Sequence, residues 1–330
     1  MQPDLGPANL VDLTTFRGYL VAVGNAATDP EPGVIWSSTD GVTWRSIAGE
    51  APLAGAYLEA VAAGDPGLVT VGSNELGRAI ALLSPDGVSW SSPRLPGASA
   101  FSATSVAWGL GRYVAVGSGI GEHPSTPTIA WLSVDGRAWT RATIDGVSHA
   151  ALFGLAAGPR GFVAAGSLRD RAAAWVSADG RVWRPVALPG GPSGVEGGRV
   201  RYVGGRFLLS VSAFGPDVDA SHGVVWSSSD GRHWTRSIAP GSGAAVFDFA
   251  AIPGGGVSVG RAEEGDQPGV VTMADANFTS WTLQPADPVF DHALALAILQ
   301  SPDGRRLVGV GNTESGAAIL LHDLPFVPRP

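Results

Sequence analysis

The sequence of 330 residues contains no cysteine and no lysine. Without cysteine the protein can form no disulfide bond, no thiolate metal site and no cysteine nucleophile. All 21 basic residues are arginine, which together with the abundance of alanine, glycine and valine indicates a GC-rich bacterial genome. The net charge is −8 and no basic stripe is present, so we expect no nucleic-acid partner.

The sequence also lacks long apolar runs and helical patterns. No run approaches the roughly 20 apolar residues that a transmembrane helix requires, so we expect no membrane span. The amino-terminal MQPDLGPANL has neither the basic nor the apolar region of a signal peptide. The protein is therefore either cytoplasmic or an extracytoplasmic or secreted protein in its mature form, and only the resemblance described below favours the second. The stretch 292–299, HALALAIL, has helical composition, but its place in the repeat described next predicts an inner strand.

A Ser-x-Asp-Gly-x-x-Trp unit recurs along the chain. Its final tryptophan falls at Trp44, Trp90, Trp139, Trp183 and Trp234, at spacings of 46, 49, 44 and 51 residues. A degraded sixth copy places Asp275 and Asn277 where serine and aspartate are expected, and ends at Trp281. A period of this length indicates a repeat architecture.

A second motif, Val-x-Val-Gly or a variant of it, keeps the same period in seven copies that begin with GYLVAVG at 18–24 and end with RLVGVG at 306–311. Each unit holds about four short apolar segments bounded by Gly, Pro and Asp-Gly turns, as expected of strands. We predict an all-β fold, a single seven-bladed β-propeller with four antiparallel strands per blade. A series of β-sandwiches is the alternative. The predicted blades span 8–48, 56–92, 101–142, 150–186, 195–237, 244–283 and 292–328.

Asp-Gly between two strands is a strong hairpin signal, because glycine accepts positive φ and aspartate can bond to the following N–H groups. A residue that occurs once in each blade is most simply structural, and ten of the eleven tryptophans occupy the repeated positions. We expect them to pack between neighbouring blades. Only Trp108 lies outside the pattern. The structural aspartates are Asp40, Asp86, Asp135, Asp179 and Asp230.

The unit resembles the Asp-box, or BNR repeat, Ser-x-Asp-x-Gly-x-Thr-Trp. That repeat is found in sialidases, sortilin-type receptors, xyloglucan-cleaving glycosidases and photosystem-assembly propellers. The resemblance spans residues 35–281, and each copy is one residue shorter between Asp and Gly than the family pattern. It implies a sialidase-like propeller whose boxes lie on the turn between the two outer strands, away from a catalytic face. It does not by itself imply a reaction.

A sialidase-like activity would require an arginine cluster, a tyrosine nucleophile assisted by glutamate, and an acid/base aspartate. Phe16-Arg17-Gly18-Tyr19 lacks the Ile-Pro of the first arginine motif, and Arg17 recurs as a turn arginine in other repeats. Tyr57 and Glu59 are the best fragment of a tyrosine and glutamate pair, and we expect them on one side of a regular strand. We assign no catalytic residue.

The loops that join second to third strands vary most between repeats, and we expect them on one rim of the propeller, opposite the Asp-Gly turns. Their charged residues give this rim a net negative charge. The rim candidates for binding are Glu122, His123, Arg169, Asp170, Asp217, Asp219, His222, Glu263, Glu264 and Asp266. Asp217, Asp219 and His222 also offer oxygen and nitrogen metal ligands, but their spacing matches no known site. We predict neither a metal nor a cofactor.

The inner strands provide a second set of candidates. Aligning the repeats places Asp12, Ala60, Ser105, Gly154, Arg199, Asp248 and Ala295 at equivalent positions. Asp12, Arg199 and Asp248 would then form a charged cluster in the channel, and Tyr57 and Glu59 are further channel candidates. The alternative is a water-filled channel with incidental ion pairs.

The seventh repeat lacks a box and its tryptophan. We expect either Phe326-Val327 or the segment from Asp4 to Leu10 to close the ring there, because an unpaired edge strand is prone to aggregation. The preferred function is a monomeric, non-catalytic scaffold that binds a protein or glycan partner through the acidic rim. A diverged glycoside hydrolase, sialidase-like or xyloglucanase-like, or a lyase with its site at the channel mouth is the alternative.

Overall fold

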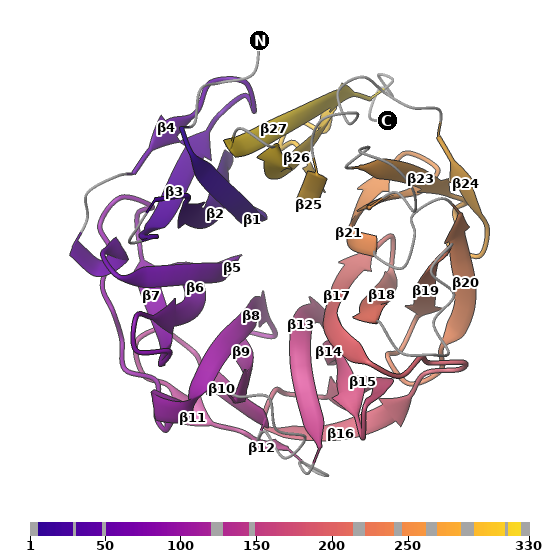
Figure 1. Cartoon of the computed structure of the whole chain (residues 1–330), viewed down its shortest axis with the longest axis horizontal. Helices are drawn as coiled ribbons and strands as arrows, with labels where there is room; N and C mark the ends of the chain where they lie inside the picture. The colour runs from indigo at the N-terminus through magenta and orange to yellow at the C-terminus, as the bar shows by residue number, and fades with distance from the viewer. Residues whose placement is uncertain are drawn as a thin grey trace.

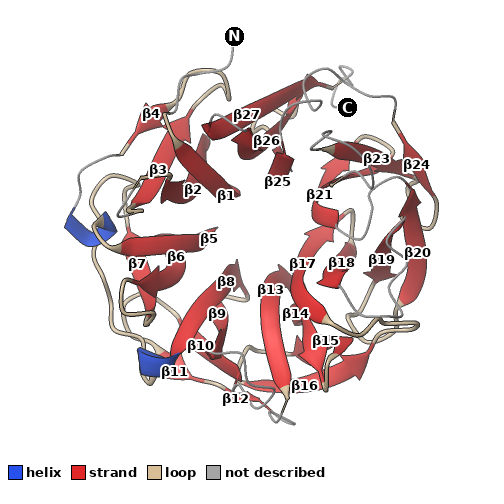
Figure 2. Ribbon diagram, in the orientation of Figure 1, coloured by secondary structure: helices blue, strands red, loops and turns tan. Residues whose placement is uncertain are grey.

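A computed structural model describes residues 6–28, 31–47, 51–119, 128–144, 149–213, 222–240, 246–261, 269–284, 294–313 and 316–324. Seven small sheets stand around a central axis as the blades of a propeller (Figure 1). Strands dominate, and the only helices in the described ranges are the single 3-10 turns η1 (Ala51–Leu53) and η2 (Ala98–Ala100) (Figure 2). No helix among these residues is long and apolar enough to cross a bilayer. The prediction of a seven-bladed all-β propeller is confirmed.

Each blade is built from consecutive strands, with the first strand innermost. Blades 1 to 3 are β1 (Ala8–Phe16), β2 (Tyr19–Ala26), β3 (Gly33–Ser38), β4 (Arg45–Ser46); β5 (Ala56–Gly64), β6 (Gly67–Asn74), β7 (Ala79–Ser84); and β8 (Phe101–Gly109), β9 (Arg112–Gly119), β10 (Thr128–Ser133), β11 (Thr140–Arg141). Blades 4 and 5 are β13 (Ala150–Gly158), β14 (Gly161–Leu168), β15 (Arg171–Ser177), β16 (Val182–Ala187), joined by β12 (Thr143–Ile144); and β17 (Val195–Val203), β18 (Arg206–Ala213), β19 (His222–Ser228), β20 (Thr235–Pro240). Blades 6 and 7 are β21 (Val246–Ile252), β22 (Gly255–Gly260), β23 (Val270–Ala274), β24 (Trp281–Leu283); and β25 (Leu294–Gln300), β26 (Arg306–Thr313), β27 (Gly316–Asp323).

Four antiparallel strands per blade are found in blades 1, 3, 5 and 6, and the other three blades differ. In blade 2 the fourth strand is reduced to one bridge between Ser91 and Leu83, because Pro93 follows and cannot donate to a ladder. In blade 4, β12 adds a fifth strand that runs parallel to β16. Blade 7 has three described strands. The stretch 292–299 enters β25, an inner strand as predicted.

The Ser-x-Asp-Gly units form the turns between the third and fourth strands. In blade 1 the Ser38 hydroxyl donates to Asp40 and accepts from the Gly41 N–H, and Asp40 accepts from the N–H groups of Val42 and Thr43. The Trp44 indole N–H closes the turn on the Gly41 carbonyl at 2.8 Å. The serine and aspartate bonds recur at Asp86, Asp135 and Asp230, and in part at Asp179.

The tryptophans lie between blades, as predicted. Seven apolar clusters fill the seven interfaces, and in six of them tryptophans of one blade pack against the preceding blade. Trp131 and Trp139 of blade 3, for example, pack with Val69 and Leu83 of blade 2. The interface between blades 6 and 7 contains none, in agreement with the missing box of the seventh repeat.

The glycine that ends the second-strand motif is required by a bulge in the inner strand. In blade 1 the pairing of β1 with β2 shifts between Leu10 and Asp12, which brings the Asn9 carbonyl against the α-carbon of Gly24. A side chain at position 24 would collide with that backbone oxygen, and the same holds at Gly72, Gly117, Gly166 and Gly311. The glycine of the motif is therefore required because the backbones of the first and second strands approach closely there.

The first and last blades meet directly. Asn312 accepts a hydrogen bond from the Leu10 N–H at 3.1 Å, and the Arg306 guanidinium donates to the Asp40 carbonyl at 3.4 Å. Residues 8–10 begin the innermost strand of blade 1, so this part of the segment from Asp4 to Leu10 does not supply a strand to blade 7, whereas Gly6 and Pro7 lie against Gly316 at the start of β27. Ala8 already pairs with Ala26 of β2, so its strand belongs to blade 1. Phe326-Val327 and residues 4–5 lie outside the described residues.

The box aspartates make the stability of the folded protein depend on pH in the acidic range. Bonds from the Ser89 and Val88 N–H groups lower the pKa of Asp86 to about 2, and similar bonds lower the pKa values of Asp40 and Asp135. A carboxyl with a lower pKa in the folded state stabilises the fold above its unfolded value of 3.8, and this contribution disappears as pH falls through about 2. We expect the urea midpoint to decrease over this range. Replacing all three aspartates with asparagine should make the urea midpoint less dependent on pH over this range. An equally steep decrease in the triple variant would show that the box aspartates are not the cause.

Candidate functional site at the channel mouth

The inner strands carry one bulge each, and the bulged residues surround the channel. They are Val11, Glu59, Thr104, Phe153, Glu196, Phe247 and Leu296. All seven side chains are partly or well exposed, although in six blades the residues on both sides of them are buried. Neighbouring blades cover both faces of an inner strand, so we attribute this exposure to the channel. The bulges lie in the first half of each strand, toward the face from which the second-to-third-strand loops emerge. We call this ring the channel mouth.

An arginine from blade 5 crosses the channel below this ring. The Arg201 Nε donates to Asp248 of blade 6 at 2.8 Å, and its Nη2 donates both to Asp248 at 2.9 Å and to Asp12 of blade 1 at 2.8 Å. The two carboxylates are completely or almost completely buried. One guanidinium thus ties together blades 5, 6 and 1.

Both carboxylates also hold the backbone of the blade that follows them. Asp12 accepts from the Val61 N–H at 3.0 Å, and Asp248 accepts from the Ile298 N–H at 2.9 Å. Buried charges are tolerated only when paired and hydrogen-bonded, and this network satisfies both conditions.

Arg199 lies at the level of the bulges. Its Nε donates to the Phe247 carbonyl at 3.1 Å, and its Nη2 donates to the carbonyls of Leu296 and Val11 at 3.1 and 3.3 Å. It also lies 3.5 Å from Asp248 and 3.7 Å from Asp12. The guanidinium therefore caps three consecutive bulges and forms the floor of the channel mouth.

The charges of the two arginines and the two aspartates neutralise one another. Burial disfavours the charged form of Asp248, but Arg201 and Arg199 outweigh this effect and hold its pKa below the ordinary value. Burial likewise opposes the charge of Arg201, and the carboxylates of Asp248 and Asp12 nevertheless raise its pKa. Two arginines and two aspartates balance to zero net charge. A carboxylate ligand would have to compete with the aspartates for Arg201 and with the bulge carbonyls for Arg199.

Glu59 leaves a negative charge at the mouth itself. Its side chain reaches solvent between buried Leu58 and Ala60. Burial among the inner strands raises the pKa of Glu59, and the charge of Arg199 partly opposes this rise. Tyr57 is half-buried two residues before it. The strand is not regular here, because the bulge falls at Glu59 itself.

The inner-strand candidates divide as follows. Asp12, Arg199 and Asp248 come together as the sequence suggested, and Arg199 additionally bonds to bulge carbonyls. Sequence reasoning missed Arg201, although its alternation with Arg199 along one strand was a usable signal. The alignment was wrong at Ala295: Ala297 pairs with Val310 in the manner of Asp12 with Val23, because the bulge is at Leu296.

Most rim candidates lie outside the described residues: Glu122, His123, Asp217, Asp219, Glu263, Glu264 and Asp266. His222 begins β19, but its side chain is likewise not described. Arg169 and Asp170 form the turn between β14 and β15 with φ of 51° and 66°. Among the described residues, no group of three or more His, Asp or Glu could hold a metal.

Comparison with known proteins bears on the fold. The sequence matches no protein-family model and no curated protein. Among solved structures, YCF48 bound to a D1 peptide matches with a TM-score of 0.66 at 15% identity, over 100% of this chain and 96% of that one. The WD40 propeller of Doa1 gives 0.60 at 12%, over 98% and 95%. Puromycin hydrolase gives 0.59 at 13%, over 96% of this chain and 52% of that one. These likenesses establish the propeller and leave function to the site.

Proposed function

We propose that the protein is a non-catalytic scaffold whose channel mouth binds an extended, basic segment of a protein partner. The observation that carries this proposal is the ring of bulge residues above a neutralised floor. The ring presents one side chain from every blade, and Phe153, Phe247, Leu296 and Val11 supply apolar surface. Glu59 and Glu196 supply the negative charge.

This arrangement favours binding over chemistry. Sialidase-type catalysis needs arginines that are free to receive a substrate carboxylate, and here Arg199 and Arg201 are engaged by aspartates and backbone carbonyls. An apolar ring with isolated carboxylates suits a peptide that contributes apolar and cationic side chains. The rim loops, acidic in sequence, would extend the same preference. The resemblance to YCF48, solved with a peptide, agrees with this proposal.

The test is selection of peptides by the protein itself. A displayed library of random 12-residue peptides is enriched on the immobilised protein, and the affinities of the recovered peptides are measured by fluorescence anisotropy. We expect peptides rich in arginine or lysine with interspersed apolar residues. Glu59→Arg should weaken them at least tenfold, since opposite charge is replaced by like charge.

The control is Val134→Ser, an exposed substitution on the box turn of blade 3, on the face opposite the channel mouth. It should leave affinity unchanged. Binding should also weaken as pH falls through the raised pKa of Glu59, and Glu59→Gln should remove that part of the pH dependence. Acidic peptides, or basic peptides that are insensitive to Glu59→Arg, would refute the assignment. Saturable binding of glycans in place of peptides would identify a different partner class.

A further inference from the structure

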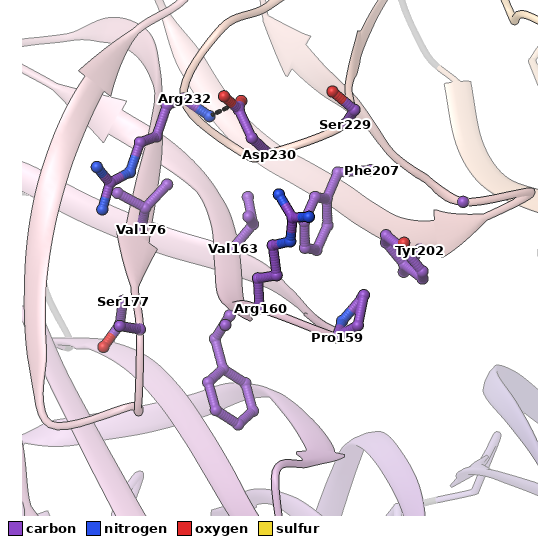
Figure 3. A pocket seen from close by; sticks show the side chains of 14 residues that line it. Pro159, Arg160, Val163, Val176, Ser177, Tyr202, Phe207, Ser229, Asp230 and Arg232 are labelled. Carbon is purple, nitrogen blue, oxygen red and sulfur yellow. Dashed lines mark hydrogen bonds between the residues drawn. The ribbon is translucent and has the colours of Figure 1, made fainter.

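A pocket lies between blades 4 and 5 on the face opposite the channel mouth. Its volume is about 300 Å³, within the usual range of small-molecule sites. The β13–β14 turn and the box turn of blade 5 form its two sides (Figure 3). Val163, Val176 and Phe207 provide apolar lining. The site is independent of the proposed function, because no channel residue contributes to it.

The pocket exists because the side chains that fill this space elsewhere are missing. Between blades 3 and 4, Arg112 opens β9 and its guanidinium crosses to the carbonyl of Asp179 in the next box. The residue in the same hairpin position of blade 4 is Gly161, which pairs with Gly158 as Arg112 pairs with Gly109. No side chain therefore crosses from Gly161 to the box of blade 5.

A second filler is missing as well. Between blades 2 and 3, the Tyr113 hydroxyl donates to the Gly67 carbonyl at 2.7 Å, and Trp108 lies against the Tyr113 ring. Between blades 4 and 5 the corresponding pair is Phe207 and Tyr202, with ring centroids 4.9 Å apart. Phe207 has no hydroxyl to reach the opposite backbone.

Two cations border the opening. Arg160 comes from the turn of blade 4 and Arg232 from the box of blade 5, and both are labelled at the pocket in Figure 3. Both are exposed, and within the described part of the chain neither guanidinium forms a hydrogen bond or ion pair. Asp230 is already engaged by the N–H groups of Arg232 and His233 and by the His233 ring. The local charge is positive on a protein of net charge −8.

We propose that this pocket binds a carboxylate joined to a small aromatic or aliphatic group. The apolar group would rest on Phe207, Val163 and Val176, and the carboxylate would accept hydrogen bonds from Arg160 and Arg232. Arginine is suited to this task because its planar fork matches a carboxylate. The same chemistry is offered by a free organic acid and by the carboxyl terminus of a peptide that ends in an aromatic residue.

The experiment uses fluorinated probes observed by fluorine NMR. 4-Fluorobenzoate is titrated into the full chain, with neutral 4-fluorobenzamide as the matched probe. A tripeptide ending in 4-fluorophenylalanine, with a free or an amidated carboxyl terminus, distinguishes the two sources. We expect saturable binding of the acid and none of the amide. Arg160→Gln with Arg232→Gln should weaken binding at least tenfold, in line with the loss of charge-assisted hydrogen bonds.

Arg305→Gln, on the equivalent turn of blade 7, is the control and should bind as the wild type does. Circular dichroism and the urea midpoint verify that each variant is folded, and both arginines are exposed, so folding should be retained. Three results would overturn the site: no saturable change with any acid, equal binding of benzamide, or unchanged affinity in the double variant.

Discussion

Replacing Arg201 with methionine is expected to destabilise the propeller by about 3–5 kcal/mol, the usual cost of leaving a buried charge without its partner. Methionine keeps much of the side-chain length but removes the donors that Asp248 and Asp12 share. Both carboxylates are then held in a site that water scarcely reaches. Chemical denaturation followed by tryptophan fluorescence measures the change, because tryptophans lie in six of the seven interfaces.

Two further variants make this result specific. Arg306→Met also breaks an arginine–aspartate pair, with Asp323, and a hydrogen bond to the Asp40 carbonyl, but these groups are exposed, so its loss should cost much less than that of Arg201. Adding Asp248→Asn to Arg201→Met removes one uncompensated charge, so the double variant should be more stable than the single one. If Arg201→Met and Arg306→Met cost the same, the channel cluster is not a buried network.

The repeat made the fold predictable because each blade solves the same packing problem with the same residues. The Asp-Gly turn, the interface tryptophan and the glycine facing the bulge recur once in most blades. Their spacing along the sequence therefore indicates the number and the length of the blades. The fourth strand of blade 2 was less predictable, since Pro93 interrupts a ladder that the period alone suggested.

The channel was only partly predictable, because it depends on how seven strands meet. Asp12 and Asp248 lie 236 positions apart, and nothing local indicates that one guanidinium joins them. The bulges also break the strict alternation on which strand faces are inferred. In blade 7 this effect placed Ala297, not Ala295, at the predicted level. The pocket between blades 4 and 5 was not predictable from the repeat. It arises where this pair of blades lacks side chains that other blades have, and the recurring motifs give no sign of such a loss.

The second large effect is expected at the glycine of a box turn. Gly180 has φ of 78°, and a β-carbon there would lie 2.6 Å from Cγ2 of Val114 in the preceding blade. Gly180→Ala should therefore incur two costs. The left-handed conformation costs about 1–2 kcal/mol for a residue with a β-carbon, and overpacking against a fully buried valine adds about 1–3 kcal/mol. We expect a total of about 2–5 kcal/mol in the free energy of unfolding.

Gly18→Ala separates the two costs. Gly18 has φ of 84°, but nothing lies within 4 Å of the added carbon, so this variant should show the conformational cost alone. In a cycle with Val114→Ala, the loss at Gly180 should shrink, because the smaller side chain removes the collision and leaves the backbone strain. Equal losses at Gly18 and Gly180, or strict additivity with Val114→Ala, would show that the box turn does not press on the preceding blade. A collision at Gly180 that Val114→Ala relieves would instead identify these turns as the outer contacts that set the spacing between blades.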